Sequence, residues 1–456
     1  MKAHNYPLSI QGDLHMKKTG WIAASIAILM LAGVCVWLYS AGYLDRNKPA
    51  IRMNEDITAI GKKKDIDIFF SDDDGGLCRL KVEIVQENKP RVIFQEAYNT
   101  RDNKEKAVKL VLESETMKLK NGPATLNISA CDCSFFKNET LVTKQIRVDM
   151  LPPQISILNP VNYLNPGGTG FITYRTSKAT TLTGVYVDDR FFAGHTLLVN
   201  SRPTSVAYIA LPLDATNAKT RISVYARDNA GNEAKVSMQY DIRPKKFRAD
   251  KVNLSDTFLL KIMPNFQASI PQLQGKTPSE VFAYVNTTLR EENNKTIQAV
   301  CRKTVNQKLW EGSFLRMRNA SPTALFGDQR TYLIGGVSYG NAIHLGVDLA
   351  STAQAPIEAA NNGIIVFAGT LGIYGNAVMI DHGLGLFSLY GHLSSIETTV
   401  GKRVQKGEKV GLSGLTGLAG GDHLHFSVLV GGQFVNPQEW WDPHWITDNV
   451  IKKMNI

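Results

Sequence analysis

The sequence predicts a mainly β protein that carries one N-terminal transmembrane helix. Three observations lead to this fold class. Two segments of about 100 residues each share a pattern of alternating apolar residues separated by turns. The last part of the chain consists of short apolar runs bounded by glycine. A long charge-free run precedes both parts. We therefore expect two β-sandwich modules, a short helical linker and a C-terminal antiparallel β-sandwich domain.

Residues 19–44 contain no charged side chain and are typical of a transmembrane anchor. About 20 apolar residues are enough to cross the hydrocarbon core of a bilayer. Lys17 and Lys18 directly precede the run, which favours a cytoplasmic location for residues 1–18 and translocation of the long part that follows. A cleaved signal peptide is the alternative, but its apolar region is normally only about 7 to 15 residues long. We therefore expect an uncleaved single span.

Residues 49–152 and 153–244 resemble two copies of one unit. Each ends in an alternating apolar run, a turn and a second alternating run, the pattern of a β-hairpin. Asp132 and Asp228 occupy matching positions that are 96 residues apart. This spacing predicts two immunoglobulin-like (Ig-like) sandwiches of about 100 residues each. The sequence around Asp228 and the turn that follows it also resembles Ig-like modules of bacterial surface proteins.

The two Ig-like modules contain no cluster of catalytic side chains in the sequence. We interpret them as spacers or as modules that dock on the cell wall. The alternative is a specific protein partner, because the edge strands of a sandwich offer unpaired backbone groups.

An acidic run at residues 71–76 in the first module could form a calcium loop. It lacks the glutamate that an EF-hand requires at its twelfth position. The sequence favours a solvated turn between two strands.

Four of the five cysteines follow the predicted anchor and would face an oxidising compartment. Cys78 lies in an early strand of the first module, whereas Cys131 and Cys133 lie near its end. We predict a disulfide bond between Cys78 and either Cys131 or Cys133.

Residues 245–325 differ in sequence pattern from the modules before them and form the predicted helical linker. Thr277, Pro278 and Glu280 make a helix start, in which threonine caps the helix and glutamate reaches back to the cap. Residues 281–304 continue with helical periodicity. The segment is interpreted as a packing linker, and the alternative is a lid that covers a cleft.

Residues 326–445 form the predicted C-terminal domain, and residues 446–456 are a tail. Five of the nine histidines lie between positions 344 and 425 of this domain. They include His344, which stands four residues before Asp348, then His392, and then the pair His423 and His425. Neutral imidazole with one carboxylate is a ligand set that zinc prefers, and three protein ligands leave a fourth position for water or substrate.

The spacing of these residues constrains their geometry. On a straight strand His344 and Asp348 would lie about 13 Å apart, whereas metal–ligand distances are only about 2 Å. The chain must therefore bend, and Gly346 provides the backbone freedom for it. His423 and His425 would share one side of a strand, about 6 to 7 Å apart.

These motifs resemble the lysostaphin and LytM type of zinc metallopeptidase, which cleaves peptides of bacterial cell-wall peptidoglycan. The resemblance implies a β-sandwich domain and one zinc ion per chain, held by His344, Asp348 and His425. It also implies that His392 and His423 activate water and stabilise the oxyanion, and it leaves open which residue does which.

The function implied by this resemblance is that of a membrane-anchored zinc metalloendopeptidase that hydrolyses peptide cross-links of peptidoglycan. The alternative is a catalytically silent scaffold that activates another cell-wall hydrolase. We expect an inner-membrane location with the bulk of the chain in the periplasm. The net charge is +10, but the sequence has no arginine-rich run or aromatic-basic ladder, so we expect no nucleic-acid partner.

Overall fold

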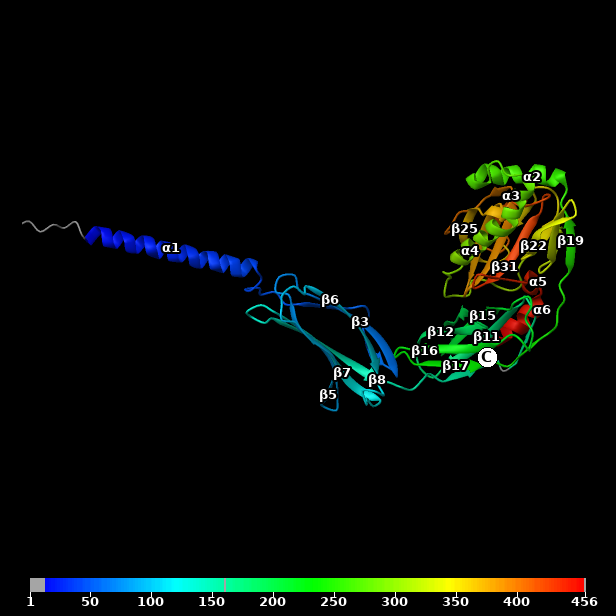
Figure 1. Ribbon diagram of the computed structural model, residues 1–456. Helices are drawn as coiled ribbons and strands as arrows, with labels where there is room; N and C mark the ends of the chain where they lie inside the picture. Colours follow the sequence, from blue (N-terminus) through cyan, green and yellow to red (C-terminus); the bar gives the residue numbers. More distant parts are fainter. Residues whose placement is uncertain (1–12, 160, 455–456) are drawn as a thin grey trace, which may run out of the picture. The chain divides into compact units, whose positions relative to one another are not determined.

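Figure 1 shows the computed structural model of the protein, which describes residues 13–159 and 161–454. Strands account for 44% of the structure and helices for 18%, so the prediction of a mainly β protein is confirmed. The chain divides into two compact units. The first unit ends at Leu151 and includes Asn229–Asn232, and the second contains Pro152–Asp228 and the chain from Glu233 onward. Each unit is described by itself.

The chain begins its described part with a single long helix, α1 (Asp13–Ser40). Its segment Trp21–Ser40 has a mean hydropathy of 2.3 and none of it is buried. By length and composition this segment suffices to cross a membrane, although a signal sequence near an N-terminus has the same properties. Residues 1–12 of the predicted cytoplasmic segment lie outside the described residues.

The first unit contains a sandwich of two sheets with the strand orders β1-β3-β6 and β2-β8-β7-β4-β5. In β4 apolar residues alternate with polar ones, so Leu80, Val82 and Ile84 all point into the core and are fully buried. The predicted hairpin at the end of this module is present as the antiparallel pair β7 and β8. The strands are β1 (Ala50–Met53), β2 (Ala59–Ile60), β3 (Lys63–Ser71), β4 (Leu77–Gln86), β5 (Lys89–Ala97), β6 (Glu105–Glu113), β7 (Gly122–Asp132) and β8 (Glu139–Val148).

The predicted disulfide bond of the first unit joins Cys78 to Cys133. The register of β4 against β7 pairs Leu77 with Asp132 and Arg79 with Cys131, and it shifts between these two pairs. Cys78 therefore lies beside the residue that follows β7, and the Cα atoms of Cys78 and Cys133 are 4.9 Å apart. Cys131 remains a free, buried thiol.

The acidic run after β3 differs from its prediction as a solvated turn. Asp73 and Asp74 are exposed, as expected. Asp72 is only 6% exposed, so the prediction was wrong for this residue. Its Oδ1 atom accepts hydrogen bonds from the backbone amides of Gly75 and Gly76, which turn the loop inward around it.

The second unit begins with another sandwich, made of the sheets β14-β15-β11-β9 and β13-β12-β16-β17 and the parallel pair β10-β18. The predicted hairpin is present as the antiparallel pair β16 and β17. The assignment of both sandwiches to the Ig-like type stays a prediction. The strands are β9 (Ile155–Ile157), β10 (Asn162–Leu164), β11 (Thr169–Thr176), β12 (Thr180–Val187), β13 (Arg190–Ala193), β14 (His195–Val199), β15 (Arg202–Ala210), β16 (Ile222–Asp228), β17 (Glu233–Ser237) and β18 (Tyr240–Ile242).

This sandwich shares a hydrophobic core with the C-terminal domain. Trp440 is fully buried, its ring centroid lies 5.7 Å from that of Tyr208, and its indole nitrogen donates to Thr169 Oγ1 at 3.2 Å. The neighbouring Glu439 carboxylate accepts hydrogen bonds from the Thr169 amide at 2.7 Å and from the Asn165 side chain at 3.0 Å. Burial raises the pKa of Glu439 to about 7. These contacts hold the second sandwich against the C-terminal domain.

The predicted helical linker contains two helical stretches. The predicted capping box is present, because Thr277 and Glu280 bond to each other's backbone amides at the start of α3 (Pro278–Tyr284). The π-helix η2 (Val285–Leu289) and α4 (Arg290–Val300) continue this helix. An earlier helix, α2 (Asp256–Ser269), starts at the cap residue Ser255 and was not predicted. The short 3₁₀ helix η1 (Pro271–Leu273) connects α2 to α3.

The C-terminal domain is built on an eight-stranded sheet of order β20-β23-β31-β27-β26-β25-β29, with β32 paired to β31. A three-stranded sheet, β24-β30-β28, accompanies it, and every strand pair in these two sheets is antiparallel, as predicted. The strands are β20 (Ser321–Ala324), β23 (Val347–Ala350), β24 (Pro356–Glu358), β25 (Gly363–Thr370), β26 (Asn376–Gly383), β27 (Leu386–Leu393), β28 (Ser395–Ile396), β29 (Arg403–Val404), β30 (Lys409–Leu412), β31 (Leu424–Val430) and β32 (Gln433–Val435).

A third sheet, β19-β21-β22, connects the helical segment to this domain. Its strands are β19 (Ala249–Asn253), β21 (Gln329–Ile334) and β22 (Val337–Ile343), and β19 runs parallel to β21. The remaining helices are η3 (Gly372–Tyr374), α5 (Pro437–Trp441), α6 (Pro443–Ile446), η4 (Thr447–Ile451) and α7 (Lys452–Met454). The predicted tail thus begins as helix, and Val450 in η4 is fully buried. Residues 455–456 of that tail lie outside the described part of the chain.

Candidate metal centre

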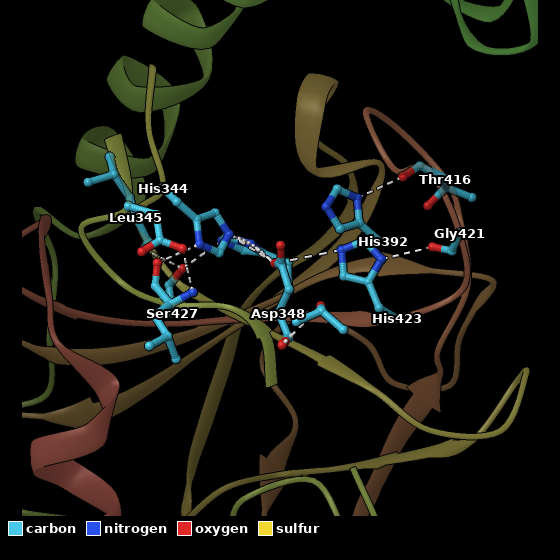
Figure 2. Close-up of polar contacts among 12 residues, drawn as sticks. His344, Leu345, Asp348, His392, Thr416, Gly421, His423 and Ser427 are labelled. Atoms are coloured by element: carbon cyan, nitrogen blue, oxygen red, sulfur yellow. Dashed lines mark hydrogen bonds and ion pairs between the residues drawn. The ribbon is translucent and has the colours of Figure 1, made fainter. Parts of the chain in front are cut away.

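The central strands of the large sheet bring the predicted metal-binding residues together (Figure 2). Asp348 on β23 is the direct cross-strand partner of His425 on β31. His344 lies just before β23, and the chain bends between it and Asp348, as predicted. All three side chains are buried, with exposed fractions of 5% to 9%.

One atom from each of these three residues converges on a single point. His344 Nε2 lies 2.9 Å from Asp348 Oδ1 and 3.1 Å from His425 Nδ1, and the latter two atoms are 2.8 Å apart. Tetrahedral zinc with ligand distances of about 2.0 to 2.1 Å separates its ligands by about 3.3 Å. The triangle of donors therefore fits such an ion after small outward shifts.

Gly346 is required in the bend for a reason other than the predicted one. Its backbone does not adopt a positive φ. A Cβ atom at this position would instead lie 2.5 Å from His425 Nε2 and 2.6 Å from Ser427 Oγ. Glycine thus provides room for the histidine and its hydrogen-bond partner.

Hydrogen bonds to the outer nitrogens define the tautomers of both histidines in the triangle. His344 Nδ1 lies 2.9 Å from the carbonyl oxygen of Leu325, which can only accept, so Nδ1 carries the proton. His425 Nε2 lies 3.0 Å from Ser427 Oγ, and this hydroxyl donates to the Leu345 carbonyl at 2.8 Å. Since that hydroxyl proton is used, Ser427 accepts from Nε2. Both inward nitrogens are therefore free to bind a metal.

Asp328 supports the site indirectly. Its carboxylate accepts a hydrogen bond from the Leu325 amide at 2.9 Å, and its backbone carbonyl accepts one from the His344 amide at 2.8 Å. The carboxylate therefore does not contact a histidine of the site, but it holds the loop whose carbonyl orients His344.

His392 and His423 face the triangle from the opposite side (Figure 2). His392 Nδ1 donates to the Thr416 carbonyl at 2.8 Å, and His423 Nδ1 donates to the Gly421 carbonyl at 2.8 Å. Each ring therefore leaves its Nε2 atom available. His423 Nε2 lies 3.6 Å from Asp348 Oδ1, and the centroids of the two rings are 4.7 Å apart.

The backbone of His392 is strained at the end of β27, with a φ of 62°. This left-handed conformation is uncommon for residues other than glycine, although histidine is among those that adopt it more often. Strain of this kind recurs at functional sites. Here it accompanies the placement of the imidazole beside the metal-binding triangle.

The electrostatic environment differs between these histidines. Burial, together with the charges that His423 and His425 would carry, lowers the pKa of His392 to about 3. Burial on its own would lower the pKa of His423, but the Asp348 carboxylate 3.6 Å away and the bond to the Gly421 carbonyl together raise this pKa. Burial would raise the pKa of Asp348, but the histidines around its carboxylate hold this pKa well below its usual range. His392 is therefore neutral at neutral pH, and His423 holds a proton more readily.

The five residues open into a cleft of about 350 Å³. Tyr374 of η3 and the basic residues Arg290 and Arg330 also line it, and Arg330 Nη2 lies 3.8 Å from Asp348 Oδ2. None of these three was singled out from the sequence. Each lies in a segment without a motif and reaches the cleft only through tertiary packing.

The helical segment contributes one wall of this cleft. Val252, Leu254 and Ser255 line it from the junction of β19 and α2, and Phe258 lines it from α2. A Cβ atom at Gly420 would lie 3.7 Å from the Phe258 ring, so this ring reaches the opposite wall. The segment thus both packs against the domain and narrows the cleft.

Residues 342–437 match the family model described as peptidase family M23. This part of the chain is a peptidase M23 domain. Four of the five site residues lie on the matched strands or directly beside them, and the fifth, His344, lies near the start of the match.

Relatives of this M23 domain include two named peptidases and one named hydrolase activator. The DD-carboxypeptidase/endopeptidase Mpg of Neisseria meningitidis is 44% identical over 95 residues, which are 21% of this chain and 22% of Mpg. The peptidoglycan DD-endopeptidase ShyA of Vibrio cholerae is 38% identical over 95 residues, 21% of this chain and 22% of ShyA. The murein hydrolase activator EnvC of Escherichia coli is 35% identical over 95 residues, 21% of this chain and 23% of EnvC. The chain thus matches about a fifth of the length of each relative.

Two other histidines of the C-terminal region lie outside the site. His382 is fully buried, and its ring nitrogens contact the Asn362 carbonyl at 2.7 Å and Ser388 Oγ at 2.8 Å, which indicates a structural role. His444 is exposed at the start of α6.

Ser427 of the M23 domain was missed from the sequence, although a signal for it exists. It stands two residues after His425 on β31, so the two side chains point to the same side of the strand. A hydroxyl at this spacing from a metal-binding histidine is placed to orient the ring.

Proposed function

We propose that this protein is a membrane-anchored zinc metalloendopeptidase that hydrolyses peptide cross-links of bacterial peptidoglycan outside the cytoplasmic membrane. The observation that carries the proposal is the buried triangle of His344, Asp348 and His425, with two further histidines beside it. The name of the relative ShyA, a peptidoglycan DD-endopeptidase, supports peptidoglycan peptides as the substrate, and the name of Mpg supports an endopeptidase activity.

The triangle would hold one zinc ion through two imidazole nitrogens and one carboxylate oxygen. When bound, zinc supplies a Lewis acid that polarises a scissile carbonyl and lowers the pKa of water. Thr416 and Gly421 carbonyls orient the remaining two histidines. The neutral His392 would accept a proton from the attacking water at Nε2, and His423, which holds a proton more readily, would donate a hydrogen bond to the oxyanion.

The apolar segment of α1 supports an anchor in the inner membrane, with the bulk of the chain in the periplasm. A single span would hold the M23 domain close to the membrane-facing side of the wall. Along the chain, the two sandwiches lie between the span and this domain, and they would act as spacers or dock on the cell wall. The alternative is a protein partner that binds their edges.

The proposed function can be tested with the full chain purified in detergent micelles and mixed with purified peptidoglycan. We expect about one zinc ion per chain and new peptide ends, whose mass identifies the bond that is cut. A chelator should abolish the release of these ends, and added zinc should restore it. Zinc binding without any cleavage would favour the alternative, a silent scaffold that activates another hydrolase, as the name of the relative EnvC indicates for that protein.

Replacing Ser427 by alanine is expected to weaken zinc binding. The hydroxyl accepts the His425 Nε2 proton, and loss of such an outer contact typically reduces metal affinity about 10- to 100-fold. Competition with a chromophoric chelator measures this affinity. Ser388→Ala is the matched control, because Ser388 is equally buried and contacts Nε2 of the structural residue His382. Equal affinities of both variants would contradict the assigned role of Ser427.

Replacing Phe258 by alanine is expected to accelerate digestion of cross-linked peptidoglycan. The ring narrows the cleft, and its apolar contact with the opposite wall is worth roughly 1 kcal/mol, which corresponds to about fivefold in rate. Initial rates of peptide release measure the effect. Leu260→Ala is the control, because Leu260 lies on the same helix, is 64% exposed and does not line the cleft. An unchanged rate for Phe258→Ala would show that this wall does not limit access.

A further inference from the structure

A second cluster of metal-binding groups lies in the first unit, far in sequence from the M23 domain. Asp45 follows α1, Asp72 follows β3, and Asp132 is the last residue of β7. These three aspartates are 6%, 6% and 1% exposed. One carboxylate oxygen from each lies within 4.8 Å of the others.

The charge of this cluster is not compensated by protein groups. Among the residues that the structure describes, no lysine, arginine or histidine forms an ion pair with any of the three carboxylates. Buried carboxylates are costly unless they are paired or bind a metal. In the second sandwich the matching residue Asp228 is also buried, but there Lys178 lies 2.7 Å from its carboxylate. The first sandwich therefore lacks the cation that the second one provides.

Two oxygen atoms of the cluster are buried without a hydrogen-bond partner in the described structure, Asp45 Oδ2 and Asp72 Oδ2. The other oxygen of each carboxylate is held in place, since Asp45 Oδ1 accepts from the Asn47 amide at 2.8 Å and Asp72 Oδ1 accepts from the Gly75 amide at 2.7 Å. The protein thus orients both carboxylates and leaves one oxygen of each for a ligand that is not protein.

Carboxylate oxygens of the cluster converge beside Gly75. A Cβ atom at this position would lie 3.0 Å from Asp132 Oδ2 and 3.1 Å from Asp45 Oδ2. Asp132 itself is oriented by Asn138, whose amide donates to its Oδ2 at 2.7 Å. The absence of a side chain at residue 75 keeps the space beside the carboxylates open.

We propose that Asp45, Asp72 and Asp132 bind a calcium ion. The donors are all oxygen, and three carboxylates with room for water or carbonyl ligands suit the six to eight oxygen ligands that calcium takes at about 2.3 to 2.6 Å. Zinc prefers nitrogen and sulfur, and magnesium gives up its water reluctantly. This site is independent of the zinc centre and of the peptidase activity proposed above.

The ion would tie the segment that follows α1 to the first sandwich. The Asn138 amide already joins the two parts, because it also donates to the Asp45 carbonyl at 2.9 Å. Arg101 adds a second contact, with its guanidinium carbon 3.3 Å from the centroid of the Tyr43 ring. Without the ion, repulsion among three carboxylates opposes these contacts. Calcium would therefore make the connection between the helix and the sandwich rigid.

The test uses the full chain in detergent micelles after removal of divalent metals with a chelator. Equilibrium dialysis with calcium should show one bound ion, with a dissociation constant of about 10⁻⁴ to 10⁻³ M, the range known for extracellular modules. Calcium should also raise the unfolding temperature. Asp45→Asn and Asp72→Asn, which keep the shape of the side chain, should each weaken binding at least about tenfold.

Asp73→Asn is the matched control, because Asp73 is exposed in the same loop and the variant loses the same charge. It should bind calcium as the wild type does. Gly75→Ala keeps all three carboxylates but fills the space between them, and it should also weaken binding. The proposal is overturned if the wild type binds no calcium, or if Asp45→Asn and Asp72→Asn bind it as tightly as Asp73→Asn. Asp45 lies outside the strands of the sandwich, so Asp45→Asn gives a clear answer even if Asp72→Asn fails to fold.

Discussion

Replacement of His344 by alanine is expected to remove zinc from the protein and to lower peptidoglycan digestion by at least about 1000-fold. Only two protein ligands, Asp348 and His425, would remain, whereas a catalytic zinc site uses three. Without bound zinc, the pKa of water returns from about 7 towards 15.7, and the attacking group is lost. Metal analysis of the purified full chain and mass spectrometry of released peptides measure the two effects separately.

The control for this substitution is His444→Ala. His444 is exposed at the start of α6 and does not line the cleft, so this variant should keep both zinc and activity. Circular dichroism should show the same β content for both variants. If His344→Ala kept its zinc and its activity, the triangle would not be the metal site, and the proposed function would lose the observation that carries it.

The second large effect is expected for His392→Asn and His423→Asn, which should keep zinc but digest peptidoglycan about 100 to 1000 times more slowly. Loss of a general base or of one oxyanion donor has effects of this size. Asparagine is chosen because it tolerates the left-handed backbone of His392, whereas alanine would add strain there. Neither residue belongs to the group of three side chains that could hold a metal ion, so the zinc content should not change.

The pH dependence of the rate distinguishes the roles of these two residues. The acidic limb of a pH–rate profile reports the protonation of the base. If His392 is the base, His392→Asn should lose this limb, and His423→Asn should keep it. The reverse result would exchange the two roles. Loss of zinc from either variant would show that the residue is a ligand and that the division proposed here is wrong.

Much of the site could be predicted because its chemistry is local in the sequence. The motifs around His344, His392 and His425 contain the side chains that could bind a metal or act on water. The spacing of His344 and Asp348 requires the bend that the structure contains. The helix start at Thr277 was also predicted, since a capping box uses residues only three positions apart. In the same way, the composition of residues 19–44 is enough to indicate a helix that can span a bilayer.

Other features depend on contacts between distant segments, and these only the tertiary structure decided. The choice of Cys133 over Cys131 depends on a register shift between β4 and β7. The wall that Phe258 adds to the cleft depends on how α2 packs, which no local motif encodes. The acidic run after β3 was taken for a solvated turn because its partners, Asp45 and Asp132, are 27 and 60 residues away.

By itself, therefore, the sequence determined the mainly β class, the five residues of the candidate site and the apolar N-terminal helix. These follow from periodicity, residue chemistry and short spacings, all of which are properties of neighbouring residues. Only the tertiary structure decided the tautomers of the histidines, the walls of the cleft and the buried cluster of aspartates. Each of these depends on which strands pair and in which register. Strand pairing and register are decided by side-chain packing over the whole core and not by neighbouring residues alone.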